Sequence, residues 1–169
     1  SVHVTGGRYE ISGKEMPDLI PFVEEMLDIH IDPGEIKPEC EEKPAPEPII
    51  NQDFYKAVEQ TFSASQYSTD KRERLIHSHG QSTAEELYKV LYSRLDRLVD
   101  MVFYCETEQD CIELVNLAQT HDVCLAPYGG GTSVSGALKM PANEKRMIVS
   151  VDMRRLNKIE WIDKENFRA

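Results

Sequence analysis

The sequence lacks several features that mark common protein classes. It has no apolar run near the roughly 20 residues of a transmembrane helix, and neither end reads as a targeting signal. Its four cysteines form no C-x-x-C pair, so we expect reduced, mostly buried thiols and no metal site. Basic residues are few: 19 against 30 acidic ones give a net charge of −11. This balance argues against nucleic acid as a partner.

A glycine-rich run is the most informative stretch that is present. It follows an apolar segment and reads Pro127, Tyr128, Gly129, Gly130, Gly131, Thr132 and Ser133. Consecutive glycines allow left-handed backbone and let a ligand approach closely. Successive N–H groups in such a turn form an anion-binding concavity, to which hydroxyl groups add donors. The run therefore predicts a site for a pyrophosphate.

Two commoner phosphate motifs do not fit this run. A P-loop needs lysine directly after its last glycine, where this chain has Thr132. The G-x-G-x-x-G fingerprint fails because its third glycine position is Val134. Asp152 lies at the spacing of a ribose-binding acid, but without the third glycine we interpret this as coincidence. From spacing alone, a flexible loop remains an equal alternative.

The pattern along the chain predicts an α+β fold in two regions. Residues 1–97 read as an N-terminal helical region with a proline-rich strap at 33–48, and residues 98–169 alternate strands and a helix. Predicted helices begin at Asp18, Asp53, Asp70, Ser82 and Thr107, and predicted strands span 98–104, 123–127, 147–152 and 159–163. A parallel β-helix-β crossover would place the glycine run at the carboxyl end of its strand, where α/β sheets bind ligands. This context favours the pyrophosphate interpretation.

Three finer expectations concern packing and caps. Ser82 and Glu85 match an S-x-x-E capping box, and Trp161 is expected in the core or on a sheet face. Apolar faces at helical spacing are expected to pack, and they comprise Leu19, Phe22, Val23, Met26 and Leu27 in one helix and Leu87, Tyr88, Leu91, Tyr92 and Leu95 in another.

The other polar residues suggest no site of their own. His77 and His79 are interpreted as a helix end with an imidazolium near the last carbonyls and Gly80 beyond it. No acid or cysteine at fixed spacing accompanies them. Ser133 and Ser135 lack a nucleophile elbow. We predict no catalytic residue in this chain.

The last 70 residues resemble the opening of the FAD-binding domain of vanillyl-alcohol-oxidase (PCMH-type) flavoproteins. The likeness rests on the strand, the Thr107-capped helix, the second strand and the glycine run, followed by residues 148–152 and 156–159. It implies that this chain holds the first half of such a domain. It also implies that residues 127–133 contribute to the FAD pyrophosphate site.

A narrower resemblance, to the family of alkyldihydroxyacetonephosphate synthases, covers nearly the whole chain. It rests on residues 7–9, 12–13, 51–54, 79–80 and 97–100. The chain would be the N-terminal part of such an enzyme, without the cap domain and without the catalytic residues. Half a cofactor site loses contacts while still meeting the cost of association, so we expect this chain alone to bind FAD weakly or not at all.

The resemblance further implies a reaction and a location for the full-length protein. The family exchanges the acyl group of acyl-dihydroxyacetone phosphate for a fatty alcohol, with no net redox change. Its members work in peroxisome-type organelles. The resemblance is compatible with a homodimer and with peripheral membrane association of the full-length enzyme. Two alternatives stay open: a fragment of an FAD-dependent 2-hydroxy-acid dehydrogenase, and a scaffold that binds nothing.

Overall fold

The computed structural model describes residues 1–4, 10–35, 45–80 and 82–168, in two compact units formed by residues 1–38 and 39–169. In the first unit, strand β1 (Val2–His3) pairs antiparallel with β2 (Glu15–Met16). Helix α1 (Leu19–Leu27) follows, and then the short 3-10 helix η1 (Pro33–Glu35). The predicted start of α1 at Asp18 is confirmed. Its predicted packing face is not, since no residue of α1 is buried and Met26 is 66% exposed.

The second unit is built on a four-stranded sheet with the order β3-β4-β6-β5. The strands are β3 (Tyr67–Ser68), β4 (Met101–Tyr104), β5 (Cys124–Tyr128) and β6 (Ile148–Asp152). β3 runs antiparallel to β4, whereas β4, β6 and β5 are mutually parallel. The α+β class and the parallel crossover are therefore confirmed, with β6 lying between the two strands that the crossover connects.

Local signals explain the crossover helix α5 (Glu108–Thr120). Thr107 and Asp110 form a reciprocal capping box at its start. The helix ends at His121, and Asp122 takes a left-handed φ of 53° that turns the chain into β5. Every residue of β6 is buried, as expected for a parallel strand covered on both faces.

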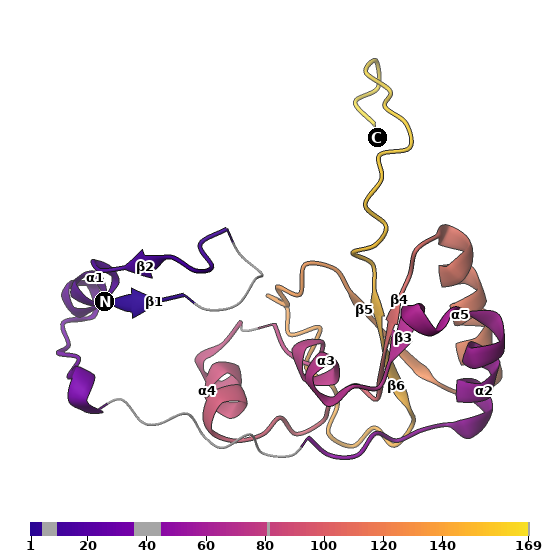
Figure 1. The fold of residues 1–169 in the computed structure, drawn as a ribbon, viewed down its shortest axis with the longest axis horizontal. Coiled ribbons are helices and arrows are strands. Elements are labelled where there is room, and N and C mark those ends of the chain that lie inside the picture. The colour runs from indigo at the N-terminus through magenta and orange to yellow at the C-terminus, as the bar shows by residue number, and fades with distance from the viewer. Residues whose placement is uncertain (5–9, 36–44, 81, 169) are drawn as a thin grey trace. The chain divides into compact units, whose positions relative to one another are not determined.

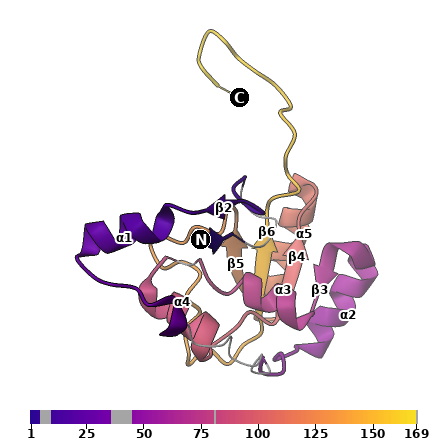
Figure 2. The same ribbon diagram turned by 60° about the vertical axis from the view of Figure 1, so that its left-hand side comes forward.

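Helices cover both faces of the sheet, as Figures 1 and 2 show. Helix α2 (Gln52–Thr61), capped by Asn51, lies with α5 on one face. There Phe62 meets Phe103 edge to face at 4.6 Å between ring centroids. The short helices η2 (Ala64–Gln66) and α3 (Lys71–Ile76) precede and follow β3. On the second face, the buried cluster consists of Val99, Val102, Tyr128, Leu138, Met140 and Ile148.

Buried polar groups tie the residues before α2 to the sheet. Arg74 donates from Nε to the Val99 carbonyl and from Nη2 to the Pro46 carbonyl, each at 2.9 Å. The buried Asp100 carboxylate accepts from the backbone N–H groups of Ile49 and Ile148, each at 2.8 Å. The boundary predicted between residues 97 and 98 thus falls inside the second unit, where β3 also pairs with β4.

Helix α4 (Ala84–Tyr92) departs from two sequence predictions. It is capped by Thr83, whose hydroxyl accepts from Glu86 N–H, and not by Ser82 with Glu85. The shift by one residue leaves the Glu86 carboxylate to accept the backbone N–H of Ser82 at 3.0 Å. Its expected packing face is also wrong, because Tyr88 is 57% and Leu91 53% exposed.

The strand predicted at 159–163 does not form. Among the described residues, Asp163 makes only an isolated antiparallel bridge with Arg168, and residues 159–163 join neither sheet. Trp161, expected in the core or on a sheet face, is 54% exposed. Alternation of apolar residues does not make a strand where no neighbour offers its backbone for pairing. The cysteines that the structure describes, Cys105, Cys111 and Cys124, are free and buried or half-buried. Within the described ranges, no helix is long and apolar enough to cross a membrane.

Candidate functional site

The glycine loop begins where β5 ends, at the carboxyl edge of the parallel strands. Gly129 and Gly130 are exposed, and Gly131 is buried with a left-handed φ of 68°. Ser133, two residues later, is also left-handed at 44°. Alternation of left-handed residues with others curls successive peptide groups into the concavities that bind anions. The loop therefore lies where the sequence predicted it, and of its three glycines Gly131 has the left-handed backbone.

Two of the three glycines are not required by the fold. A Cβ built on Gly129 meets nothing within 4 Å, and one on Gly130 meets only Thr132 Cγ2, at 3.9 Å. Neither residue has a left-handed φ, so larger residues would be compatible with the backbone. Because these two glycines have no side chains, the space beside the loop main chain is open. Such space suits a ligand that contacts the main chain.

The two hydroxyl residues of the loop differ in their surroundings. Thr132 is exposed. Ser133 is half-buried, and its Oγ accepts the backbone N–H of Leu138 at 2.9 Å. A hydroxyl that accepts one hydrogen bond can still donate its own proton. Both side chains could therefore act as donors to an anion at the loop.

Pro127 and Tyr128 belong to the approach of the loop. Pro127 is the exposed penultimate residue of β5. Tyr128, the last residue of the strand, is 1% exposed and packs in the second core cluster. The Tyr128 hydroxyl has no hydrogen-bond partner among the described residues. Tyr128 is thus a packing residue, whose ring anchors the start of the loop in the second core cluster.

A buried charged cluster lies under the end of β5. Tyr104, Asp152 and Tyr128 are in register at the ends of the three parallel strands. The His77 ring lies 4.3 Å from the Tyr128 ring between centroids, and its Nε2 is 2.9 Å from Asp152 Oδ2. His77 Nδ1 is 2.8 Å from the Glu73 carbonyl oxygen. Both partner atoms, a carboxylate oxygen and a backbone carbonyl oxygen, are hydrogen-bond acceptors.

Asp152 is the centre of this cluster. Burial by itself raises the pKa of its carboxyl, but hydrogen bonds from His77 and Arg154 outweigh that effect and hold the pKa well below its usual range. Arg154 Nε is 2.9 Å from Asp152 Oδ2, and its guanidinium carbon lies 5.2 Å from the Tyr128 ring centroid. Burial, together with the nearby Glu73 carboxylate, raises the pKa of Tyr104 to about 12.

Sequence reasoning missed this cluster. It treated the position of Asp152 as coincidence and found no acid for His77, because the two residues are 75 positions apart. No local spacing signals such a pair. The interpretation of His77 as a helix end is correct, since it is the C-cap of α3.

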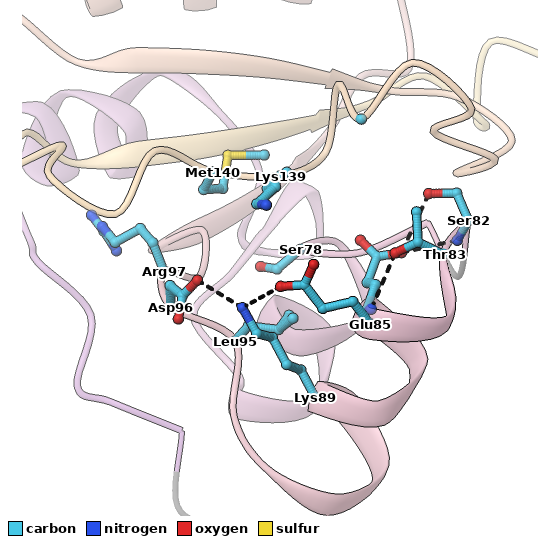
Figure 3. Close-up of a pocket in the computed structure, with 12 residues that line it drawn as sticks. Ser78, Ser82, Thr83, Glu85, Lys89, Leu95, Asp96, Arg97, Lys139 and Met140 are labelled. Atoms are coloured by element: carbon cyan, nitrogen blue, oxygen red, sulfur yellow. Dashed lines mark hydrogen bonds and ion pairs between the residues drawn. The ribbon is translucent and has the colours of Figure 1, made fainter.

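A separate pocket of about 130 Å³ lies between the start of α4, residues 95–97 and residues 136–140, as Figure 3 shows. Lys89 lies in its wall and is held by Glu85 at 2.9 Å and Asp96 at 3.0 Å. These carboxylates neutralise the ammonium group. We assign no ligand to this pocket.

Comparison with known proteins bears on the glycine loop. Residues 99–169 match the family described as FAD binding domain. Alkyldihydroxyacetonephosphate synthase from Caenorhabditis elegans is 35% identical over 167 residues, which covers 98% of this chain and 27% of that protein. The same enzyme from Trypanosoma brucei brucei is 32% identical over 169 residues, covering 99% and 27%. The chain is therefore similar over nearly its whole length to alkyldihydroxyacetonephosphate synthases.

Solved structures show the same similarity. Crystal structures of alkyldihydroxyacetonephosphate synthase in the P212121 and P1 forms each superpose with a TM-score of 0.71 at 28% identity. They cover 76% of this chain, and this chain covers 24% and 25% of them. The chain thus spans about a quarter of the length of the relatives it matches. The resemblance to the family and to its FAD-binding domain is confirmed.

Proposed function

We propose that residues 127–133 bind the diphosphate of FAD. The observation that carries this proposal is the open space above Gly129 and Gly130, two glycines that neither backbone strain nor packing explains. The FAD binding domain match, which includes the whole loop, supports the choice of cofactor. A side chain at either position would extend into that open space.

Each residue of the loop would contribute to FAD binding in a different way. Gly131 gives the turn its left-handed step, and the loop amides donate to the phosphate oxygens. Thr132 and Ser133 would add hydroxyl donors, while Pro127 and Tyr128 fix the direction in which β5 delivers the loop. FAD supplies the flavin chemistry when bound, and this chain orients its diphosphate.

For the full-length protein, we propose the synthase activity of its relatives. It would exchange the acyl group of acyl-dihydroxyacetone phosphate for a fatty alcohol and release a fatty acid, with no net redox change. The catalytic residues would lie outside this chain, which alone would be inactive. A location in a peroxisome-type organelle, a homodimer and association with a membrane surface belong to the same proposal, and they rest on the family alone.

The synthase is favoured over a 2-hydroxy-acid dehydrogenase by where the similarity lies. The matches to the synthases extend over 98% and 99% of the chain and so include the residues before the FAD binding domain match at 99. A glycine loop alone would not separate these two classes. The residues before it do, because they are shared with the named synthases.

A pair of isosteric substitutions tests the diphosphate site. Gly130→Asp and Gly130→Asn add side chains of equal size in open space, but only Asp adds a negative charge. If the ligand is a diphosphate, Asp should weaken FAD binding about tenfold more than Asn, or ~1.4 kcal/mol, and the gap should shrink with added salt. Flavin fluorescence, titrated to millimolar FAD, measures both affinities.

Thermal unfolding without FAD serves as the control for this pair. Both variants should unfold close to the unaltered chain, because a Cβ at residue 130 meets only Thr132 Cγ2, at an ordinary contact distance of 3.9 Å. Equal affinities for the two variants would contradict a diphosphate at this loop. Unchanged affinity in both would show that FAD, if bound, lies elsewhere.

A further inference from the structure

Gly80 is in contact with the glycine loop from a distant part of the chain. A Cβ built on Gly80 would lie 2.3 Å from Ser133 Cβ, 3.0 Å from the Thr132 carbonyl oxygen and 3.1 Å from the Gly131 carbonyl oxygen. Gly80 has no left-handed φ, so its backbone would accept alanine. Space alone requires glycine here: the main chain at Gly80 is the surface against which residues 131–133 are seated.

Residues 77–80 are themselves held firmly in place. His77 is buried between the rings of Tyr104 and Tyr128 and is paired with Asp152. The Ser78 hydroxyl donates to the Arg74 carbonyl at 2.6 Å and accepts the Val99 N–H at 2.9 Å. These bonds link the end of α3 to the beginning of β4. The surface under the loop is therefore fixed at its His77 and Ser78 end.

The far end of the segment is tied as well. The Gly80 N–H donates to Glu86 Oε2 at 3.3 Å, and the same oxygen accepts the Ser82 N–H. Glu86 lies in the first turn of α4, whose N-cap is Thr83. A segment held by both α3 and α4 thus supports the loop at Ser133, while His77 supports it at Tyr128.

We propose that residues 77–80 are the floor of the FAD diphosphate site and position its loop, with Gly80 acting through Ser133 and His77 acting through Tyr128. This inference rests on the proposed function of the loop. It adds to the site a segment that lies before the FAD binding domain match at residues 99–169. Residues 77–80 are positioning residues, because their contacts are with the loop and not with the ligand.

A double-mutant cycle tests the contact between Gly80 and Ser133. Gly80→Ala should push residues 131–133 out of place and weaken FAD binding about tenfold. Ser133→Gly removes the Cβ that the new methyl group would meet, at a position whose φ of 44° suits glycine. The single Ser133→Gly change costs one hydroxyl donor. The double variant should bind nearly as well as Ser133→Gly alone. The 2.3 Å contact has then gone, and the two carbonyl oxygens at 3.0 and 3.1 Å need to yield by only a few tenths of an ångström.

Two readouts separate the possible results. Flavin fluorescence to millimolar FAD gives the affinities, and amide NMR shifts of Gly129–Ser133 without FAD report the loop position. The inference is supported if the affinity losses of the two single variants are not additive and the loop shifts of Gly80→Ala revert in the double variant. A merely structural role of Gly80 would not produce this rescue of affinity. If Gly80→Ala fails to fold, the double variant must still fold and bind like Ser133→Gly.

Three results would overturn the inference. Unchanged affinity in Gly80→Ala would do so while leaving the diphosphate site in place. Independent losses that multiply in the double variant would show that Gly80 does not act through Ser133. At concentrations where the unaltered chain does bind FAD, absence of any FAD-induced shift of the loop amides would instead reject the diphosphate site, and the inference with it.

Discussion

At the scale of single residues, Asp152 shows how one carboxylate organises the sheet edge. Its side chain is fully buried and accepts from His77, from Arg154 Nε and from the Arg154 backbone N–H. Removing one partner of a buried ion pair costs several kcal/mol, since the other charge stays buried without compensation. The Asp152 carboxylate therefore contributes to stability as well as to the support of Tyr128.

The depressed pKa of Asp152 makes part of this stability depend on pH. A group whose pKa is lower in the folded state stabilises above its unfolded value and loses that contribution as pH falls through the folded value. Unfolding free energy should therefore decrease as pH falls below about 4, the ordinary value for aspartate. Asp152→Asn should lower stability at neutral pH and flatten this acid dependence, as urea unfolding at several pH values would measure.

An exposed carboxylate supplies the matched control. Asp122 is paired only at the surface with Arg146, and its side chain is 80% exposed, so the pair contributes little. Asp122→Asn should retain the acid dependence of the unaltered chain. An Asp152→Asn variant with the same slope would show that the acid sensitivity arises from other groups.

At the scale of elements, the start of α4 shows how two adjacent candidates compete for one cap. Both Ser82 and Thr83 have a glutamate three residues later. Thr83 takes the cap, accepting Glu86 N–H at 3.1 Å, whereas the Ser82 hydroxyl makes only a long 3.5 Å contact with Glu86 Oε2. The choice places Glu86 where it also bonds Gly80. The cap thereby links α4 to the segment under the glycine loop.

This difference predicts unequal effects of two alanine substitutions. Thr83→Ala should destabilise the chain by about 1 kcal/mol, the ordinary value of a lost N-cap, whereas Ser82→Ala should change little. Urea denaturation of the two variants measures the difference. A larger loss of stability for Ser82→Ala than for Thr83→Ala would show that Ser82 is the N-cap, as the sequence suggested.

At the scale of the whole molecule, apolar side chains near the C-terminus stand out by their exposure. Ile159 is 76%, Ile162 62% and Phe167 96% exposed, alongside Trp161. The chain covers 27% of the length of its curated relatives. In this chain these residues face solvent.

Trp161, the single tryptophan of the sequence, reports this exposure directly. In the 169-residue chain, its emission should lie close to that of tryptophan in water and should be quenched strongly by iodide. Denaturation should shift the emission only slightly, because the indole is already half exposed. A blue-shifted, protected emission would contradict the exposed placement of residues 159–163.

The amino-acid sequence by itself determined the parts of the protein that depend on local signals. The capping box at Thr107, the apolar run of β6 and the glycine loop after β5 were all predictable because each is encoded within a few neighbouring residues. The family resemblance could also be read from such short motifs. The fold class and the similarity to the synthases are confirmed, whereas the roles of residues 127–133 toward FAD stay predictions.

Only the tertiary structure decided which distant residues meet and which apolar residues remain exposed. His77 meets Asp152 because α3 packs beside β4, the strand that neighbours β6. Gly80 meets Ser133 because the segment after α3 lies against the glycine loop. Periodicity cannot show such contacts, since it records only the face of an element and not what covers that face. For the same reason, the sequence predicted a packing face on α4 and a strand at 159–163. In the structure, the apolar side chains of both segments are exposed.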